Sequence, residues 1–169
     1  MKRLFAFTVT VITLFIFAGC SSPAKKEITR ENLLDTAFSS EADITLGKLN
    51  AQAVITRSGK GEWETEVSSP DSLSGIKLTF TEGNVKASYK GLEMSVPQSA
   101  LPVKAMMLCL IEAVDTNASA ETLTGSENGK YLDISGNING GEYILSVDDK
   151  GAVHSFVMDN NQLNIKFNS

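Results

Sequence analysis

Apolar and polar residues alternate with a period of two along much of this chain. Four segments in the first half show the pattern most clearly, at 51–56, 62–67, 76–81 and 85–90. Five more follow in the C-terminal third, one opening at Leu123 and the others at 131–134, 143–147, 153–158 and 163–167. Side chains of a strand point alternately to opposite faces, so each segment is predicted to form a strand with one buried face.

Short polar segments rich in glycine and asparagine separate these strands. Examples are Ser58-Gly59-Lys60-Gly61, Lys90-Gly91 and Asn128-Gly129. Such residues favour tight turns, and tight turns join neighbouring strands antiparallel. Roughly nine antiparallel strands are too many to lie flat, so we expect the sheet to curl into an open or half β-barrel.

Two segments have helical spacing instead. Residues 29–38 place Leu33, Leu34 and Phe38 on one side, which predicts a short N-terminal helix. Residues 98–114 predict a longer helix that is apolar on nearly every side. Such a helix must be covered on nearly every side, and it is too short to cross a membrane.

The predicted fold class is therefore α+β, mostly β. It combines a curled antiparallel sheet with a short N-terminal helix and one apolar helix in the concave face or the mouth. Two interpretations of the apolar helix stay open: it plugs a cavity that takes a ligand, or it completes the core of a domain without a ligand. Adjacent Met106 and Met107 would make its contacts adaptable.

The first 19 residues resemble a secretory signal peptide. Lys2 and Arg3 precede an uncharged, mainly apolar segment over 4–17. Phe17-Ala18-Gly19-Cys20 then resembles the lipobox of bacterial lipoproteins, although Phe17 stands where leucine is more usual. A plain secretory signal followed by an incidental cysteine is the alternative.

The lipobox resemblance implies cleavage before Cys20 and a diacylglycerol group on its thiol, with a possible further N-acyl chain. Two chains suffice for stable anchoring, since each buried methylene contributes about 0.8 kcal/mol. We therefore expect a cleaved signal over 1–19, a lipidated tether over 20–28 and a single domain over 29–169. The protein would lie on the extracytoplasmic face of the cell membrane, or of the outer membrane in a diderm host.

Charge and cysteine content narrow the range of partners. Without Lys2 and Arg3, the 15 basic residues become 13 against 20 acidic ones, a formal charge of −7 with no basic cluster. This composition argues against nucleic acid as a partner. With Cys20 lipidated, only Cys109 remains, and its apolar surroundings predict a buried, inert thiol.

The inventory of catalytic motifs is small, so we expect no enzyme activity, no metal and no cofactor beyond the lipid on Cys20. The one histidine, His154, is predicted to pack on a strand. No serine has a nucleophile motif, and no cysteine and histidine have metal-ligand spacing. Asp148-Asp149-Lys150-Gly151 is interpreted as a hairpin turn rather than a calcium loop.

The order of elements resembles the LolA/LolB-like superfamily of open β-barrels with helices in the mouth. Two stretches carry this resemblance: 61–70, a strand ending at a proline, and 75–84, a strand followed by its turn. The resemblance covers roughly 28–167 and implies a cavity that holds acyl chains or other apolar groups. It supplies no binding residue by direct match.

Two functions of different classes follow as hypotheses. The first is an anchored carrier or receptor that holds an apolar ligand, such as a lipid or acyl chain, between the sheet and the helix. The residues predicted to line or cover its cavity are Trp63, Phe80, Tyr89, Met106, Met107 and Leu110. The second is an interaction or signalling lipoprotein that presents an outer face to an envelope protein. An exposed apolar patch without an internal pocket would favour this second hypothesis.

Overall fold

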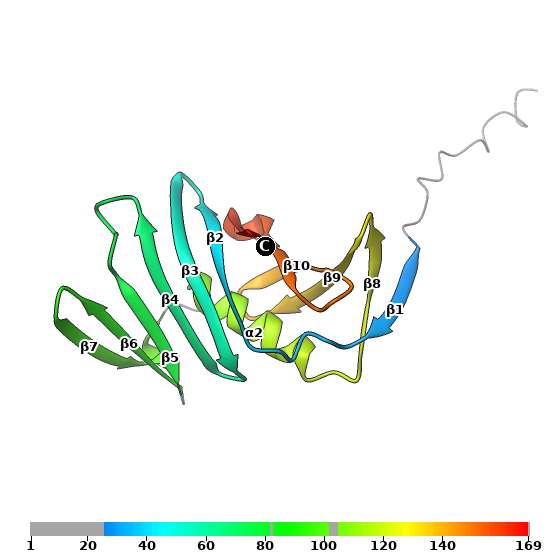
Figure 1. Ribbon diagram of the computed structural model, residues 1–169, viewed down its shortest axis with the longest axis horizontal. Coiled ribbons are helices and arrows are strands. Elements are labelled where there is room, and N and C mark those ends of the chain that lie inside the picture. Colours follow the sequence, from blue (N-terminus) through cyan, green and yellow to red (C-terminus); the bar gives the residue numbers. More distant parts are fainter. Residues whose placement is uncertain (1–25, 82, 102–104, 169) are drawn as a thin grey trace, which may run out of the picture.

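The computed structural model describes residues 26–81, 83–101 and 105–168. Twelve strands share one antiparallel sheet (Figure 1). Their bounds are β1 Glu27–Glu31, β2 Phe38–Leu46, β3 Leu49–Gly59, β4 Glu62–Ser69, β5 Lys77–Thr81, β6 Asn84–Tyr89, β7 Leu92–Pro97, β8 Thr122–Asn128, β9 Tyr131–Ile138, β10 Gly141–Val147, β11 Val153–Met158 and β12 Leu163–Asn168. The described residues also form one α-helix, α2 (Met106–Ala118), and two short 3₁₀ turns, Gln98–Ala100 and Asp159–Asn161.

The strands run in the order β1-β8-β9-β10-β11-β12-β2-β3-β4-β5-β6-β7. Two meanders, β2 to β7 and β8 to β12, are joined side by side where β12 pairs with β2. Because β1 and β7 do not pair with each other, the sheet stays open while it bends around α2 (Figure 1). The predicted class, a mostly β fold with a curled antiparallel sheet and one apolar helix, is confirmed.

This strand order explains why the helix must be apolar. The chain leaves β7 at one edge of the sheet and re-enters at β8, next to β1 at the other edge. The connection crosses the concave face as α2, whose 13 residues span about 20 Å. A helix laid across a concave sheet is contacted on most of its circumference, so it must be apolar around most of it.

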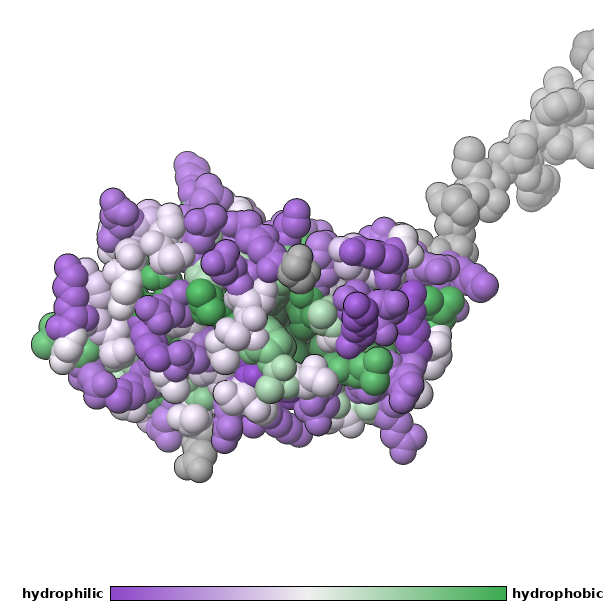
Figure 2. All heavy atoms as spheres, in the orientation of Figure 1, coloured by the Kyte–Doolittle hydropathy of each residue, from purple (hydrophilic) through white to green (hydrophobic). Residues whose placement is uncertain are grey.

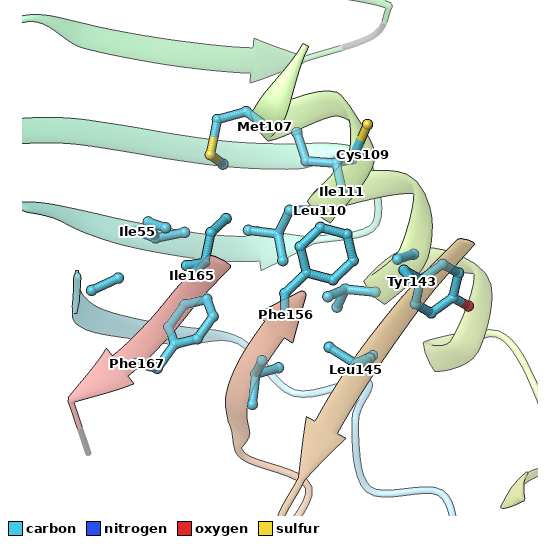
Figure 3. Close-up of a cluster of buried hydrophobic side chains, with 14 of the residues drawn as sticks. Ile55, Met107, Cys109, Leu110, Ile111, Tyr143, Leu145, Phe156, Ile165 and Phe167 are labelled. Atoms are coloured by element: carbon cyan, nitrogen blue, oxygen red, sulfur yellow. The ribbon is translucent and has the colours of Figure 1, made fainter. Parts of the chain in front are cut away.

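The core forms where α2 meets the centre of the sheet. Leu110 and Met107 of the helix lie over Ile55 of β3, Ile165 of β12 and Phe156 of β11 (Figure 3). Of these, Ile55, Leu110, Phe156 and Ile165 have no measurable exposure to solvent. The alternation detected in the sequence therefore delivers one apolar row per strand to a single shared core.

The predicted N-terminal helix over 29–38 is wrong. Residues 27–31 form β1, which pairs with β8 in a register that sets Arg30 opposite Leu123, and β2 begins at Phe38. The segment between them is a loop, in which Asn32 donates to the carbonyl oxygens of Asn117 and Ala120 at the end of α2. Pairing with a distant strand thus overrides the local helical spacing. Glu27 and Ile28, assigned to the tether from sequence, belong to this strand.

The long helix lies later in the chain than predicted. It spans 106–118 rather than 98–114, and residues 98–100 form a 3₁₀ turn. Leu101, which directly precedes a proline in the sequence, has an extended backbone with φ −83° and ψ 150°, so a continuous helix from residue 98 is interrupted there. The predicted helical positions Val103 and Lys104 lie outside the described residues, as do the signal segment 1–19 and Cys20.

The strand count was underestimated by three, since β1, β2 and β7 were not predicted. Within the described part of the chain, no helix has both the length and the apolar character that crossing a membrane requires.

Candidate functional site

An apolar hollow of about 270 Å³ lies on the concave face at the β7 end of the sheet. Strands β5, β6 and β7 form its wall, and Leu101, Ala105 and the first residues of α2 form the opposite side. All eleven of its described lining residues are apolar: Leu78, Phe80, Val85, Ala87, Met94, Val96, Leu101, Ala105, Met106, Met107 and Leu108.

The strand registers explain how these side chains come together. Phe80 lies opposite Val85, which lies opposite Val96, so three strands contribute one apolar row. In the next row Ala87 stands between Leu78 and Met94. A methyl group in the middle of that row leaves space that a larger side chain would fill, so the hollow depends on the small size of Ala87.

The hollow borders the β7 edge of the sheet, where large apolar side chains remain in contact with solvent. Met94 in its wall is 64% exposed, and Leu92 two residues earlier is 75% exposed. Figure 2 shows hydrophobic side chains at the left end of the molecule, where Figure 1 places β7. Exposed apolar residues gathered at one place mark a surface that another apolar group can cover.

A buried polar cluster, the Asp115 clamp, holds the other end of α2 against the sheet. The Asp115 carboxylate accepts from Arg57 Nε at 2.9 Å, from the Gly61 backbone N–H at 2.9 Å and from Trp63 Nε1 at 3.1 Å. The Arg57 guanidinium also pairs with Asp35 at 2.9 Å and donates to the Thr36 carbonyl oxygen. Three segments distant in sequence are thereby fixed to the last turns of α2.

The clamp exists because β3 and β4 place these groups at one end of their hairpin. Gly61 has a φ of +74°, a conformation that favours glycine, and it turns its N–H toward the helix. Arg57 and Trp63 face each other in the register of the two strands. The sequence pattern gave no sign of this arrangement, because a charged residue on an otherwise apolar helix resembles a solvent-facing position.

Three of the six residues predicted to contact a ligand line the hollow: Phe80 on β5 and Met106 and Met107 at the start of α2. Trp63 does not, because its ring is buried, donates to Asp115 and packs edge-on against Phe38. Leu110 points into the core instead (Figure 3). Tyr89 is half-buried near the tip of the β6–β7 hairpin, opposite Leu92 and in contact with the Lys90 ammonium.

Strand β7 contributes to this site although it was not predicted. Leu92, Met94 and Val96 alternate with Glu93 and Ser95, which was a usable strand signal.

The groups with catalytic potential lie elsewhere. Cys109 is buried at 1% exposure, as predicted. His154 stacks on Tyr131 with ring centroids 4.0 Å apart, and Asp148 accepts from the backbone N–H groups of Lys150 and Ala152, which confirms the hairpin turn. Across the described residues, no group of three His, Cys, Asp or Glu side chains could hold a metal ion.

A larger depression of about 710 Å³ lies over β9, β10 and the 3₁₀ turn after β11. Its lining is mixed, with Asn137, Glu142, Asp159 and Asn160 beside Ile144 and Val157. Five of its nine lining residues are polar or charged. The smaller hollow is the better candidate for an apolar ligand, because burying apolar groups against polar walls leaves those walls unsatisfied.

Comparison with known proteins supports the fold and identifies no family. No protein family model matches the chain, and no curated protein matches it significantly in sequence. Among solved structures, an uncharacterized conserved protein from Thermus thermophilus is similar in fold, with a TM-score of 0.51, 14% identity and coverage of 80% of this chain and 77% of that one. A LolA superfamily protein from Nitrosomonas europaea matches with a TM-score of 0.33 and 9% identity, over 76% of this chain and 67% of that one.

Proposed function

We propose that this protein is a membrane-anchored extracytoplasmic lipoprotein that binds an apolar ligand, such as a lipid or acyl chain, without catalysing a reaction. The observation that carries the proposal is the apolar hollow between β5–β7 and the start of α2, with its eleven apolar lining residues. Membership of the LolA/LolB-like superfamily is part of the proposal. Its support is the order of elements and the open sheet that bends around one apolar helix.

The physical chemistry of the hollow favours an aliphatic chain. An apolar cavity of about 150 Å³ stays dry and takes up small apolar molecules, and this hollow is larger. Each methylene moved from water into it contributes about 0.8 kcal/mol. Met94, Met106 and Met107 supply flexible, polarisable contacts that adapt to a mobile chain.

The open side of the hollow suits a ligand with a polar head. Met94 on β7 is largely exposed while Phe80 on β5 is 1% exposed, so the solvent exposure of the lining decreases from β7 to β5. An acyl chain can lie along this gradient with its head group in water. Anchoring through Cys20 would keep such a binding site close to a membrane that supplies lipids.

Photo-cross-linking in cells tests this proposal. Cells expressing the full chain are fed a fatty acid that carries a diazirine, and ultraviolet light should attach it to peptides within 77–97 and 105–108. The light requirement separates this product from fatty acid joined to Cys20. Ala87→Phe fills the hollow and should reduce the attachment at least several-fold.

Thr79→Phe is the matched control, because Thr79 lies opposite Lys86 on the other face of the same strands. It adds the same side chain without entering the hollow and should leave the attachment unchanged. Equal labelling of all three proteins, or labelling confined to other peptides, would exclude the hollow as the binding site.

A further inference from the structure

Strand β7 is the edge of the sheet with the weaker protection against pairing. In the sequence Leu92-Glu93-Met94-Ser95-Val96-Pro97, Glu93 is the one charged residue. The opposite edge, β1, reads Glu27-Ile28-Thr29-Arg30-Glu31 and has three charges in five residues. Charged side chains and proline on an edge strand discourage another strand from adding to it. In β7 the proline stands only at the last position, so Glu93 and Ser95 are less protected than the residues of β1.

The turn before β7 determines which of its backbone groups face outward. Lys90 and Gly91 both have positive φ, at 48° and 83°, and Tyr89 pairs with Leu92, which together define a two-residue hairpin. The turn hydrogen bond directs the N–H of Leu92 to β6. Hydrogen bonding alternates along an antiparallel pair, so the backbone N–H and C=O groups of Met94 and Val96 also face β6. The backbone groups of Glu93 and Ser95 therefore face the open edge.

We propose that β7 pairs antiparallel with β7 of a second copy of this chain, with Met94 opposite Met94 of the second copy. In this register Glu93 of each copy exchanges backbone hydrogen bonds with Ser95 of the other. The two neighbouring registers are worse. One sets the two Glu93 carboxylates opposite each other, and the other sets Glu93 opposite Pro97, which has no N–H to donate.

The same register covers the apolar side chains that the monomer leaves exposed. Leu92 and Met94 are the two most exposed large apolar side chains of the described residues, at 75% and 64%. Pairing would bring Leu92 against Val96 of the second copy and Met94 against its counterpart, all on the concave side. Glu93 keeps its 2.8 Å ion pair with Lys86 on the other face. Because Met94 lines the hollow, the hollows of the two copies would adjoin.

A disulfide test reads out this register directly. Opposed residues at a position without hydrogen bonds have Cα atoms about 4.5 Å apart, which lies inside the range that a disulfide spans. The full chain carrying Met94→Cys, expressed in an oxidising extracytoplasmic compartment, should therefore run as a dimer on non-reducing electrophoresis. The full chain without this substitution controls for Cys20 and Cys109.

Ser95→Cys is the matched control, because Ser95 and its counterpart lie diagonally across the pair, about 8 Å apart by strand spacing, and cannot be bridged without backbone movement. The Met94→Cys dimer should exceed the Ser95→Cys dimer several-fold. Adding Ser95→Pro to Met94→Cys removes an outward N–H donor and should therefore abolish the cross-link. The variant should still fold, because proline is tolerated on an edge strand.

Equal cross-linking at positions 94 and 95 would show chance collision and overturn the proposal. So would a monomer for both variants, or a cross-link to a protein of different mass, which would assign the edge to another partner. Met94 is exposed, so its substitution does not disturb the core. The readout requires no lipid, and its result is therefore independent of whether the hollow binds one.

Discussion

Asp115 holds the C-terminal part of α2 against the sheet. It is 7% exposed and Arg57 is 1% exposed, so the ion pair between them lies out of water. Removing Asp115 leaves the buried Arg57 with only the exposed Asp35 as its counter-charge, and it leaves the Gly61 and Trp63 N–H groups without their acceptor, at a cost of about 3–5 kcal/mol. Asp115→Ala should lower the free energy of unfolding by that amount in chemical denaturation.

Glu112 of the same helix is exposed and provides the control. Glu112→Ala should change the free energy of unfolding by no more than about 0.5 kcal/mol. The double variant Arg57→Met, Asp115→Leu replaces both charges by apolar groups. Its loss of unfolding free energy should be smaller than the sum of the losses in the two single variants. An additive result would show that the two side chains do not interact.

His154 offers a clean titration because it is the only histidine in the chain. Burial, reinforced by the charges of Lys166 and Lys130, holds the pKa of His154 below its ordinary value of 6.5. The unfolded chain therefore binds the proton more readily than the folded one. The stability contributed by neutral His154 is complete above pH 6.5 and is lost as the pH falls from 6.5 through the folded pKa.

Nuclear magnetic resonance of the imidazole protons of an untagged protein should give a midpoint below 6.5. His154→Phe keeps a ring stacked on Tyr131 and should flatten the dependence of unfolding free energy on pH just below this value. A midpoint at or above 6.5 would contradict the burial argument.

Helix α2 contains both core and hollow positions within one turn, so two leucines can distinguish them. Leu110 is fully buried in the core, while Leu108 is partly buried and lines the hollow. Leu110→Ala should cost about 3–5 kcal/mol, because it opens a cavity in packed surroundings. Leu108→Ala should cost on the order of 1 kcal/mol, since it enlarges a space that already exists.

Thermal or chemical unfolding of the two variants measures this difference. Equal losses would indicate that the hollow is packed as tightly as the core. That outcome would also weaken the proposed function, because a tightly packed region has no room for an acyl chain.

The strands could be predicted where a segment carries its own signal. Alternation located β3 to β6 and β8 to β12, because one buried face of a sheet imposes a period of two. β1 could not be found this way, since Glu27–Glu31 contains a single large apolar residue and becomes a strand only by pairing with β8. β2 was obscured at its start by helical spacing that ends at Phe38.

The candidate site was half predictable for the same reason. Methionines on an apolar helix and an aromatic residue on a strand indicated an apolar contact, and Phe80, Met106 and Met107 do line the hollow. Trp63 was misplaced because its partner, Asp115, lies 52 residues away, and no local pattern reveals a hydrogen bond of that range. The position of Trp63 is set by a long-range contact, whereas local composition was enough to indicate the other three residues.

For the molecule as a whole, the prediction with the widest consequence concerns its two cysteines. The full chain should become labelled by an alkyne-tagged fatty acid and should be found in the membrane fraction. Cys20→Ala should abolish both the label and the membrane retention. Cys109→Ala should change neither, because that side chain is buried at 1% exposure. Label that persists in Cys20→Ala would contradict the lipobox interpretation.

The position of β12 at the middle of the sheet has a consequence for how the protein is made. The two meanders are held together through a strand formed by Leu163–Asn168, which the ribosome supplies after every other strand described. Until those residues emerge, Ile165 and Phe167 are missing from the core and the faces they cover stay bare. A nascent chain therefore cannot complete this core before Leu163–Asn168 has been synthesised, because the two meanders meet through that strand.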